Sequence, residues 1–300
     1  NLSITTGDGN DSYNINTSSG AGDINLTSGN GSDTYNVIDN SGNLNITSGD
    51  GNDSYNINTS SGVGDINLTS GNGSNTYNVT DNSGNLNITS GDGNDSYNIN
   101  TSSGAGDINL TSGNGSNTFN VTDNSGNLNI VTGSGNDTFY INTASGVGQV
   151  NITVGDGNDI FNFNSSANLN VSLVDTHSGN DLFNISQNSH IDINNFSTTN
   201  HDQLSLANII SGSVDTGHVQ NWIEIVDNGN GGNSKNSGSY ELFVNENHNW
   251  VDIATLNLDS NANSNKPNFY YDSQNHTIHY ESTTSSSSDV HLSITPKNHD

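Results

Sequence analysis

The chain has 300 residues, of which 31 are Asp or Glu and 3 are Lys or Arg, so its formal charge at pH 7 is −28. A charge this negative repels phosphate backbones and argues against nucleic acid as a partner. No apolar run approaches the roughly 20 residues of a membrane-spanning helix. The chain has no cysteine, which excludes disulfides, a thiol nucleophile and a cysteine zinc site.

A repeat of 42 residues argues against disorder, which the 28% hydrophobic content and the high net charge would otherwise suggest. Residues 45–57 recur nearly unchanged as residues 87–99. Each repeat holds two similar halves, whose turns begin at glycines alternately 22 and 20 residues apart. These glycines are Gly7, Gly29, Gly49, Gly71, Gly91, Gly113, Gly133 and Gly155.

Four apolar columns run through the aligned half-repeats, and the first of them is aromatic. In the first half-repeat the columns are Tyr13, Ile15, Ile24 and Leu26, with Asn, Ser and Thr between them. Alternation of apolar and polar residues is typical of half-buried strands. One such unit cannot bury its apolar side, but stacked units can. The sequence therefore predicts an all-β fold, a right-handed parallel β-solenoid of about nine coils of 20–22 residues, spaced about 4.8 Å apart.

The turn before the aromatic column is rich in glycine and aspartate, as in Gly7-Asp8-Gly9-Asn10-Asp11. Glycine allows positive φ, and a carboxylate that closes the turn adds the hard oxygen ligands that Ca²⁺ prefers. Two carboxylates on neighbouring coils, about 5 Å apart, would repel by roughly 3 kcal/mol at an effective dielectric constant near 20. Bound calcium would remove this cost. The candidate calcium ligands are Asp8, Asp11, Asp33, Asp50, Asp53, Asp92, Asp95, Asp137, Asp156, Asp159 and Asp181.

These turns are not all equally acidic. Asn75 and Asn117 replace Asp in two coils, so full calcium sites are best supported at the consecutive acidic turns of Asp137, Asp159 and Asp181, and fewer or weaker ions are expected elsewhere. The opposite edge keeps one aspartate per turn without the full motif. Those residues are Asp23, Asp39, Asp65, Asp81, Asp107 and Asp123. The alternative interpretation is that all of these are solvated Gly-Asp turns without metal.

The pattern Gly-x-Gly-Asn-Asp-x-aromatic resembles the nonapeptide of RTX (repeats-in-toxin) proteins, Gly-Gly-x-Gly-x-Asp-x-apolar-x. The resemblance covers about residues 1–190. It implies a calcium-bound β-roll that folds after type I secretion. The family's coil is shorter and binds calcium at both edges, whereas here the second edge lacks the motif. Leu2 and Ile4 match the third and fourth columns, so we expect the repeat to continue upstream of Asn1.

Residues 191–300 form a predicted second domain, a β-rich cap associated with secretion. Strand-like runs occupy 203–206, 222–226, 240–244 and 254–258, a hairpin is expected over 268–280, and the serine run 285–288 is a predicted loop. Residues 191–258 resemble the region that follows RTX repeats in type I secreted adhesins and surface-layer proteins. The alternative is a cap that only protects the end of the solenoid.

No catalytic motif stands out in the chain. It has no Gly-x-Ser-x-Gly elbow and no phosphate loop, and His276 and His279 lack the spacing of a zinc-protease pair. We therefore expect a non-enzymatic, secreted, extracellular protein of the cell surface, a surface-layer subunit or an adhesin. Its expected partners are calcium ions together with its own copies or cell-surface components, with no nucleic acid and no membrane span.

Two other functions fit the same sequence. The first is a folding and secretion module of an enzyme such as a protease, lipase or epimerase, whose catalytic domain lies upstream. The second is a solenoid that binds ice or glycan through an outward threonine column. That column comprises Thr47, Thr69, Thr89 and Thr111.

Overall fold

The chain forms two compact units, Asn1–Ile152 and Thr153–Asp300, in a computed structural model. The structure describes residues 1–17, 22–38, 42–59, 64–80, 84–101, 106–122, 126–143, 148–164, 170–175, 178–186, 190–197, 201–210, 216–228, 238–246, 249–258, 269–280 and 289–296. Asp39, Asp81, Asp123, Leu169, the three lysines and the serine run 285–288 lie outside the described residues.

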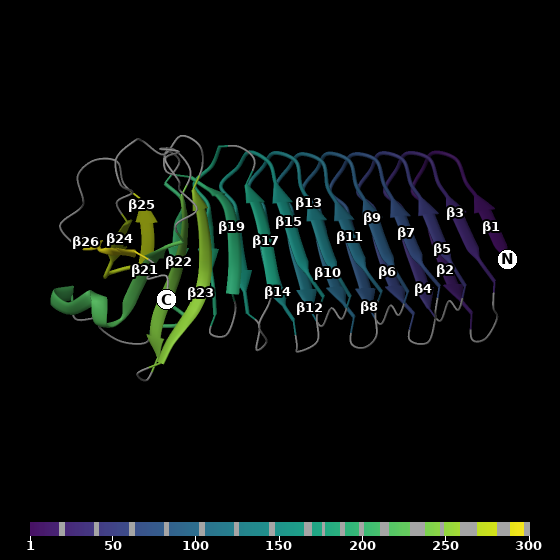
Figure 1. The fold of residues 1–300 in the computed structure, drawn as a ribbon. Helices are drawn as coiled ribbons and strands as arrows, with labels where there is room; N and C mark the ends of the chain where they lie inside the picture. The colour runs from purple at the N-terminus through teal and green to yellow at the C-terminus, as the bar shows by residue number, and fades with distance from the viewer. Residues whose placement is uncertain are drawn as a thin grey trace. The chain divides into compact units, whose positions relative to one another are not determined.

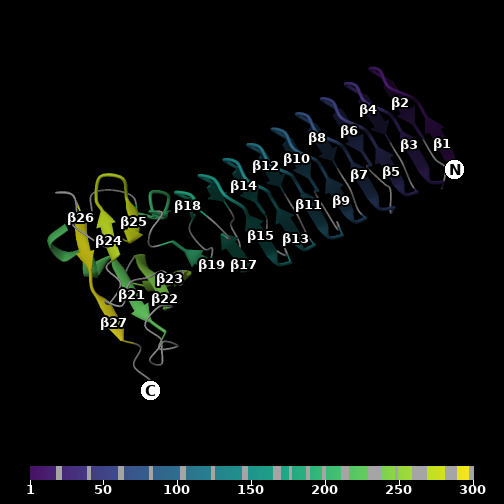
Figure 2. The same cartoon turned by 90° about the horizontal axis from the view of Figure 1, so that it is seen from above.

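The first unit is a parallel β-solenoid of about seven turns (Figures 1 and 2). This confirms the predicted fold class, although the sequence predicted about nine coils. One sheet contains β1 (Leu2–Thr5), β3 (Ile24–Thr27), β5 (Leu44–Thr47), β7 (Ile66–Thr69), β9 (Leu86–Thr89), β11 (Ile108–Thr111) and β13 (Leu128–Val131). The other contains β2 (Ser12–Asn16), β4 (Thr34–Ile38), β6 (Ser54–Asn58), β8 (Thr76–Thr80), β10 (Ser96–Asn100), β12 (Thr118–Thr122) and β14 (Thr138–Asn142). Each coil thus contributes one strand to each sheet, as the two runs per half-repeat predicted.

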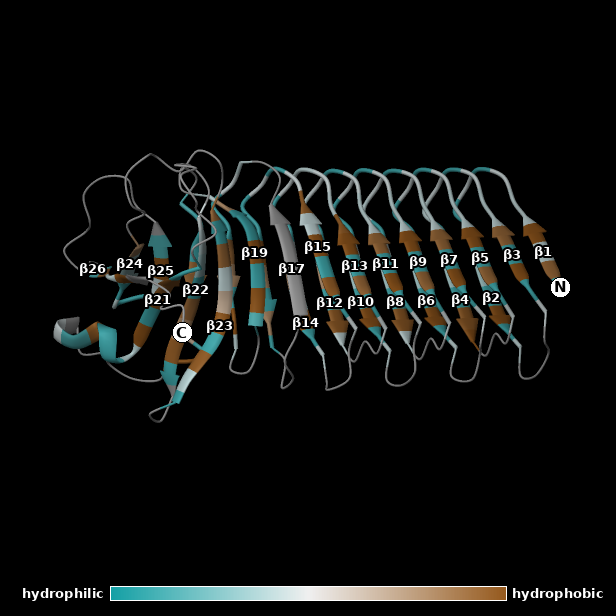
Figure 3. Ribbon diagram, in the orientation of Figure 1, coloured by the Kyte–Doolittle hydropathy of each residue, from teal (hydrophilic) through white to brown (hydrophobic). Residues whose placement is uncertain are grey.

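The core of this unit consists of the four predicted apolar columns, now stacked in register. Leu26 pairs with Ile46 and Tyr13 with Tyr35, and hydropathy alternates along the strands (Figure 3). The aromatic rings from Tyr13 to Phe139 stack with centroids 4.5–5.0 Å apart and interplanar angles of 5–16°. Rings at this separation retain contact with both neighbours. A thin core can therefore hold the fold with few apolar residues.

The outward faces of the two sheets are tiled by asparagine. Each Asn Nδ2 donates to the Oδ1 of the Asn one coil earlier, at 2.8–2.9 Å, as from Asn36 to Asn14 and from Asn45 to Asn25. No strand from β1 to β14 contains a charged residue. All acidic residues described in this unit therefore lie at the turns.

The second unit begins with parallel strands and ends with antiparallel ones. β15 (Val150–Val154) crosses the boundary between the units; then come β16 (Ile160–Phe163), β17 (Asn170–Asp175), β18 (Leu182–Asn184), β19 (His190–Phe196) and β20 (Gln203–Ser205). After the 3₁₀ helix η1 (Thr216–Asn221) come β21 (Ile223–Asp227), β22 (Ser239–Glu246), β23 (Asn249–Leu258), β24 (Phe269–Asp272), β25 (Thr277–Tyr280), β26 (Asp289–Leu292) and β27 (Ile294–Pro296). Every described strand predicted beyond residue 200 is present, and β26 and β27 are additional.

Parallel pairing persists in the second unit from β16 through β18 to β20 and from β17 through β19 to β23. β23, β22 and β21 then pair antiparallel, as do β20 and β25, and β24 with β25 and β26. The boundary between the units at residue 152 precedes the predicted end of the repeat at 190. In the described part of the chain, no helix is long and apolar enough to cross a membrane.

Candidate metal-binding turns

The Gly-Asp turns require glycine because the stacked backbones approach closely. Gly31 has φ +137 and Gly51 has φ +153, a region that residues with a side chain rarely adopt. A Cβ on Gly51 would also collide with the carbonyl oxygen of Gly31 in the preceding coil. The second glycine of the motif therefore fixes how tightly one turn packs on the next.

The outer aspartates of these turns are exposed and form a ladder with asparagine. The Asp8 carboxylate accepts the backbone N–H of Asn30, the Asn30 side chain accepts that of Asp50, and Asp50 accepts that of Asn72. The pattern continues through Asp92 to Asn114, with all distances between 2.8 and 2.9 Å. Each side chain thus replaces a hydrogen-bonding partner that the turn backbone lacks.

Alternation of Asp and Asn also separates the charges of this ladder. Asp8, Asp50 and Asp92 are two coils apart, or about 10 Å at the usual strand spacing, which is close to the Debye length at physiological salt. The opposite edge does the same with Asp23, Asp65 and Asp107, whose carboxylates alternate with Asn43, Asn85 and Asn127. The 42-residue period therefore spaces like charges at both edges, and the expected 5 Å repulsion does not apply to these ladders.

The inner aspartates form a second ladder that is buried. Asp33, Asp53, Asp95 and Asp137 are only 1–2% exposed. Here the backbone N–H of each rung donates to the side-chain oxygen of the next rung, at 2.8–3.0 Å from Asp11 to Asp137. Asn75 and Asn117 are rungs of the same ladder. Carboxylates on adjacent coils occur only where no Asn intervenes, as at Asp33 and Asp53.

The second oxygen of an inner carboxylate meets different partners in different coils. Ser48 donates its hydroxyl hydrogen to Asp53 at 2.6 Å and Ser90 donates to Asp95 at 2.7 Å. Asp33 Oδ2, in contrast, is buried with no hydrogen-bond partner in the described structure. A buried acceptor that receives no hydrogen bond is costly, so a cation bound at this atom would be stabilising.

The asparagine rungs indicate what surrounds such an atom. Asn75 Nδ2 donates to Ser70 Oγ at 3.2 Å and to the carbonyl oxygens of Gly73 at 3.2 Å and Gly71 at 3.4 Å. At Asp33, the equivalent rung, a carboxylate oxygen replaces this amide nitrogen. There the Ser28 hydroxyl is bonded to the Tyr35 hydroxyl, and Asp33 Oδ2 receives no hydrogen bond from a described residue. Carboxylate and carbonyl oxygens are the ligands that a hard cation such as Ca²⁺ prefers.

Burial raises the pKa of three inner carboxyl groups, those of Asp53, Asp95 and Asp137. The pKa of Asp53 and that of Asp95 are raised by desolvation, and the pKa of Asp137 is raised by desolvation to about 6. Hydrogen bonds from Ser48 and Ser90 oppose the shift at Asp53 and Asp95. In the absence of a cation, these groups are therefore poised to take up a proton.

The predicted ligands thus separate into two sets. Asp11, Asp33, Asp53, Asp95 and Asp137 share the inner ladder of the first unit, whereas Asp8, Asp50 and Asp92 line the exposed outer ladder. Asp156 in the second unit accepts the backbone N–H of Ser178, as an outer rung does. Within the described ranges, no three His, Asp or Glu side chains lie close enough together to hold a metal ion. A cation here would depend on single carboxylates and backbone carbonyls.

The inner ladder includes one further rung, Asp202, which was not among the predicted ligands. Asp159 donates its N–H to Asp181, and Asp181 donates to Asp202 at 3.0 Å. Asp202 is fully buried, and its other oxygen accepts the N–H of Ser197 at 2.7 Å. The signal was present in the sequence, since Asp202 precedes Leu204 by two residues as Asp181 precedes Phe183. Leu204 and Phe183 are register partners.

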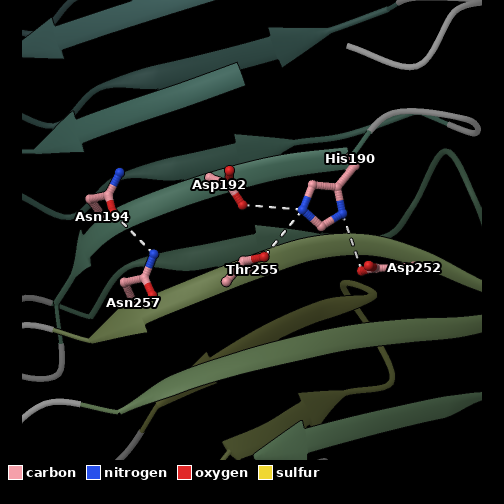
Figure 4. A network of polar contacts seen from close by, with 6 residues as sticks. All are labelled: His190, Asp192, Asn194, Asp252, Thr255 and Asn257. Atoms are coloured by element: carbon pink, nitrogen blue, oxygen red, sulfur yellow. Dashed lines mark hydrogen bonds and ion pairs between the residues drawn. The ribbon is translucent and has the colours of Figure 1, made fainter. Parts of the chain in front are cut away.

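A second polar cluster surrounds His190 at the start of β19 (Figure 4). Its Nε2 lies 3.1 Å from both Asp192 Oδ1 and Thr255 Oγ1, and its Nδ1 lies 3.2 Å from Asp252 Oδ1. The hydrogen bond with Asp252 and the two nearby carboxylates raise the pKa of His190 to about 9. This cluster ties β19 to β23, which the Asn257–Asn194 hydrogen bond also joins at 3.0 Å.

The Thr255, His190 and Asp252 side chains follow the order of a hydroxyl–His–carboxylate triad. A general base must be neutral at the working pH, with an ideal pKa near that pH. His190 is instead held protonated at neutral pH, mainly by its hydrogen bond with Asp252 and further by the Asp192 carboxylate. The cluster is therefore suited to joining strands and unsuited to base catalysis.

No protein-family model, no curated protein and no solved structure matches this chain.

Proposed function

We propose that the chain is a non-catalytic structural segment of a secreted, calcium-stabilised cell-surface protein, a surface-layer subunit or an adhesin. The observation that carries this proposal is how the first unit uses its polar side chains. Asparagine, aspartate and serine side chains hydrogen-bond to one another or to the backbone of a neighbouring coil. Such a repeat can lengthen by adding coils, because each coil offers hydrogen-bonding groups to the adjacent coil.

The calcium part of the proposal rests on the inner ladder. Asp33 Oδ2 is buried without a donor, and at the equivalent Asn75 rung the same position faces two carbonyl oxygens. Asp11, Asp33, Asp53, Asp95 and Asp137, with the glycine carbonyls of their turns, would hold the ion. Bound Ca²⁺ would supply positive charge among these oxygens. Folding would then depend on calcium, since binding free energy adds to folding free energy.

The decisive experiment compares the chain with and without a chelator. Far-UV circular dichroism and thermal unfolding are recorded in EDTA and in millimolar Ca²⁺, and bound calcium is counted by elemental analysis after desalting. We expect calcium to raise the melting temperature or to restore the β signal. Identical curves without bound calcium would refute the metal proposal and leave the fold unaffected.

Asp33→Asn is the matched variant, because the chain itself uses Asn at this rung in other coils. It keeps the oxygen that accepts the Asp11 N–H, and it supplies donors to the turn carbonyls. We expect it to fold and to bind less calcium than the parent. Calcium-dependent ordered sheets in electron micrographs would favour a surface-layer subunit, and soluble monomers under the same conditions would favour an adhesin.

A further inference from the structure

A mixed polar and apolar pocket of about 550 Å³ lies in the second unit, and none of its lining residues belongs to the acidic ladders. It is formed by η1, β21, the beginning of β23 and the end of β26. Val219, Ile223 and Leu292 contribute buried apolar surface and are at most 5% exposed. Its volume falls within the range of small-molecule sites.

An exposed tryptophan lines this pocket. Trp250, one of the two tryptophans in the chain, is 42% exposed. The other, Trp222, is 40% exposed and does not line the pocket. Asn245 fixes both positions, since its N–H donates to the Trp222 carbonyl at 2.9 Å and it pairs with Trp250 across β22 and β23. The indole of Trp250 thus provides a large flat surface on a paired strand.

Polar groups complete the lining. Glu224 offers an acceptor, and Gln220, Ser293 and His291 can both donate and accept. The ring of His291 packs edge-on against Tyr270 with centroids 5.5 Å apart, so a strand neighbour restrains it. The pocket therefore combines one aromatic face with several two-way hydrogen-bonding groups.

We propose that this pocket binds a neutral saccharide of one or two rings. A sugar ring presents C–H groups on one face, which pack on an indole, and hydroxyls at its rim, which both donate and accept hydrogen bonds. Glu224 and the net charge of −28 disfavour anionic ligands, and none of the described residues is Lys or Arg. The polar lining disfavours a purely apolar ligand, whose binding would leave those groups unpaired.

The test titrates the whole chain with neutral mono- and disaccharides of glucose, galactose and N-acetylglucosamine by isothermal calorimetry. Trp250→Ala should weaken binding at least tenfold, and the matched control Trp222→Phe should bind within twofold of the parent. In Trp222→Phe the only remaining tryptophan is Trp250, so its fluorescence should follow the calorimetric isotherm. Circular dichroism tests whether each variant folds. If Trp250→Ala does not fold, Glu224→Gln takes its place as the pocket variant.

Several results would overturn the proposal. One is the absence of binding by every neutral saccharide at millimolar concentration. Another is equal weakening by the Trp250 and Trp222 substitutions, which would place the ligand elsewhere. Preference for acidic sugars, or uptake of an apolar dye that no saccharide displaces, would assign the pocket a different ligand. The proposal does not depend on the calcium ladders, so its failure would leave the proposed structural function intact.

Discussion

Asp137→Asn should stabilise the calcium-free chain near neutral pH. The Asn Oδ1 keeps the hydrogen bond that Asp137 accepts from the Asn117 N–H at 2.8 Å. The substitution removes a carboxylate that is 1% exposed. Burial raises the pKa of this carboxyl group from 3.8 to about 6. A shift of about two pKa units corresponds to about 3 kcal/mol of free energy of unfolding. Other rungs of the chain already carry this Asn.

The pH dependence gives the sign of this effect. A raised carboxyl pKa means that the folded state penalises the charged form. The penalty is therefore absent below pH 3.8, grows as the pH rises, and is complete above about pH 6. The gain from Asp137→Asn should be about 3 kcal/mol at pH 7.5 and about half of that at pH 5. Calcium should shrink the gain at pH 7.5, because a bound cation would remove the same penalty from the parent.

Urea unfolding followed by far-UV circular dichroism in EDTA measures the effect at both pH values. The converse variant Asn117→Asp serves as the control, since it places an extra buried carboxylate between Asp95 and Asp137 and should be destabilising at pH 7.5. The reasoning fails if Asp137→Asn unfolds at lower urea than the parent. It also fails if the gain is the same at pH 5 and pH 7.5.

Three further predictions concern other parts of the chain. Gly51→Ala should lower the free energy of unfolding, measured in urea, by about 1–3 kcal/mol because of strain at a positive φ. Gly7→Ala, which has open space around its Cβ, should be nearly neutral, and equal losses in the two variants would contradict the close-packing argument. Tyr97→Phe should lower the free energy of unfolding by about 1 kcal/mol, because it removes the 2.6 Å hydrogen bond to Ser90 while keeping the ring stack. An unchanged melting curve would show that this hydrogen bond does not contribute to stability. The raised pKa of His190 means that the protonated ring stabilises the fold below pH 6.5, and this stability is lost as the pH rises through about 9. Because the ring is partly exposed and screened by solvent, the contribution is about 1 kcal/mol. Unfolding followed by tryptophan fluorescence should detect it, and it should vanish in His190→Gln.

The parallel β-solenoid and its core follow from the spacing of apolar residues along the chain. Period-two alternation repeated every 20 or 22 residues leaves stacking in register as the way to bury four apolar columns, so Tyr13 had to meet Tyr35 and Leu26 had to meet Ile46. The glycine motif likewise located the turns. These features were predictable because each follows from local spacing and from a neighbour that is nearly identical in sequence.

The roles of the aspartates, in contrast, depend on how the coils stack. Sequence spacing treated Asp8 and Asp11 as one set of ligands, whereas the fold exposes the first and directs the second into a ladder whose following rungs are buried. It also revealed the contacts of His190 with Asp252 and Thr255, which lie 62 and 65 residues away and reach it only through strand pairing. Burial and hydrogen-bond direction depend on neighbouring coils, and no single turn contains that information.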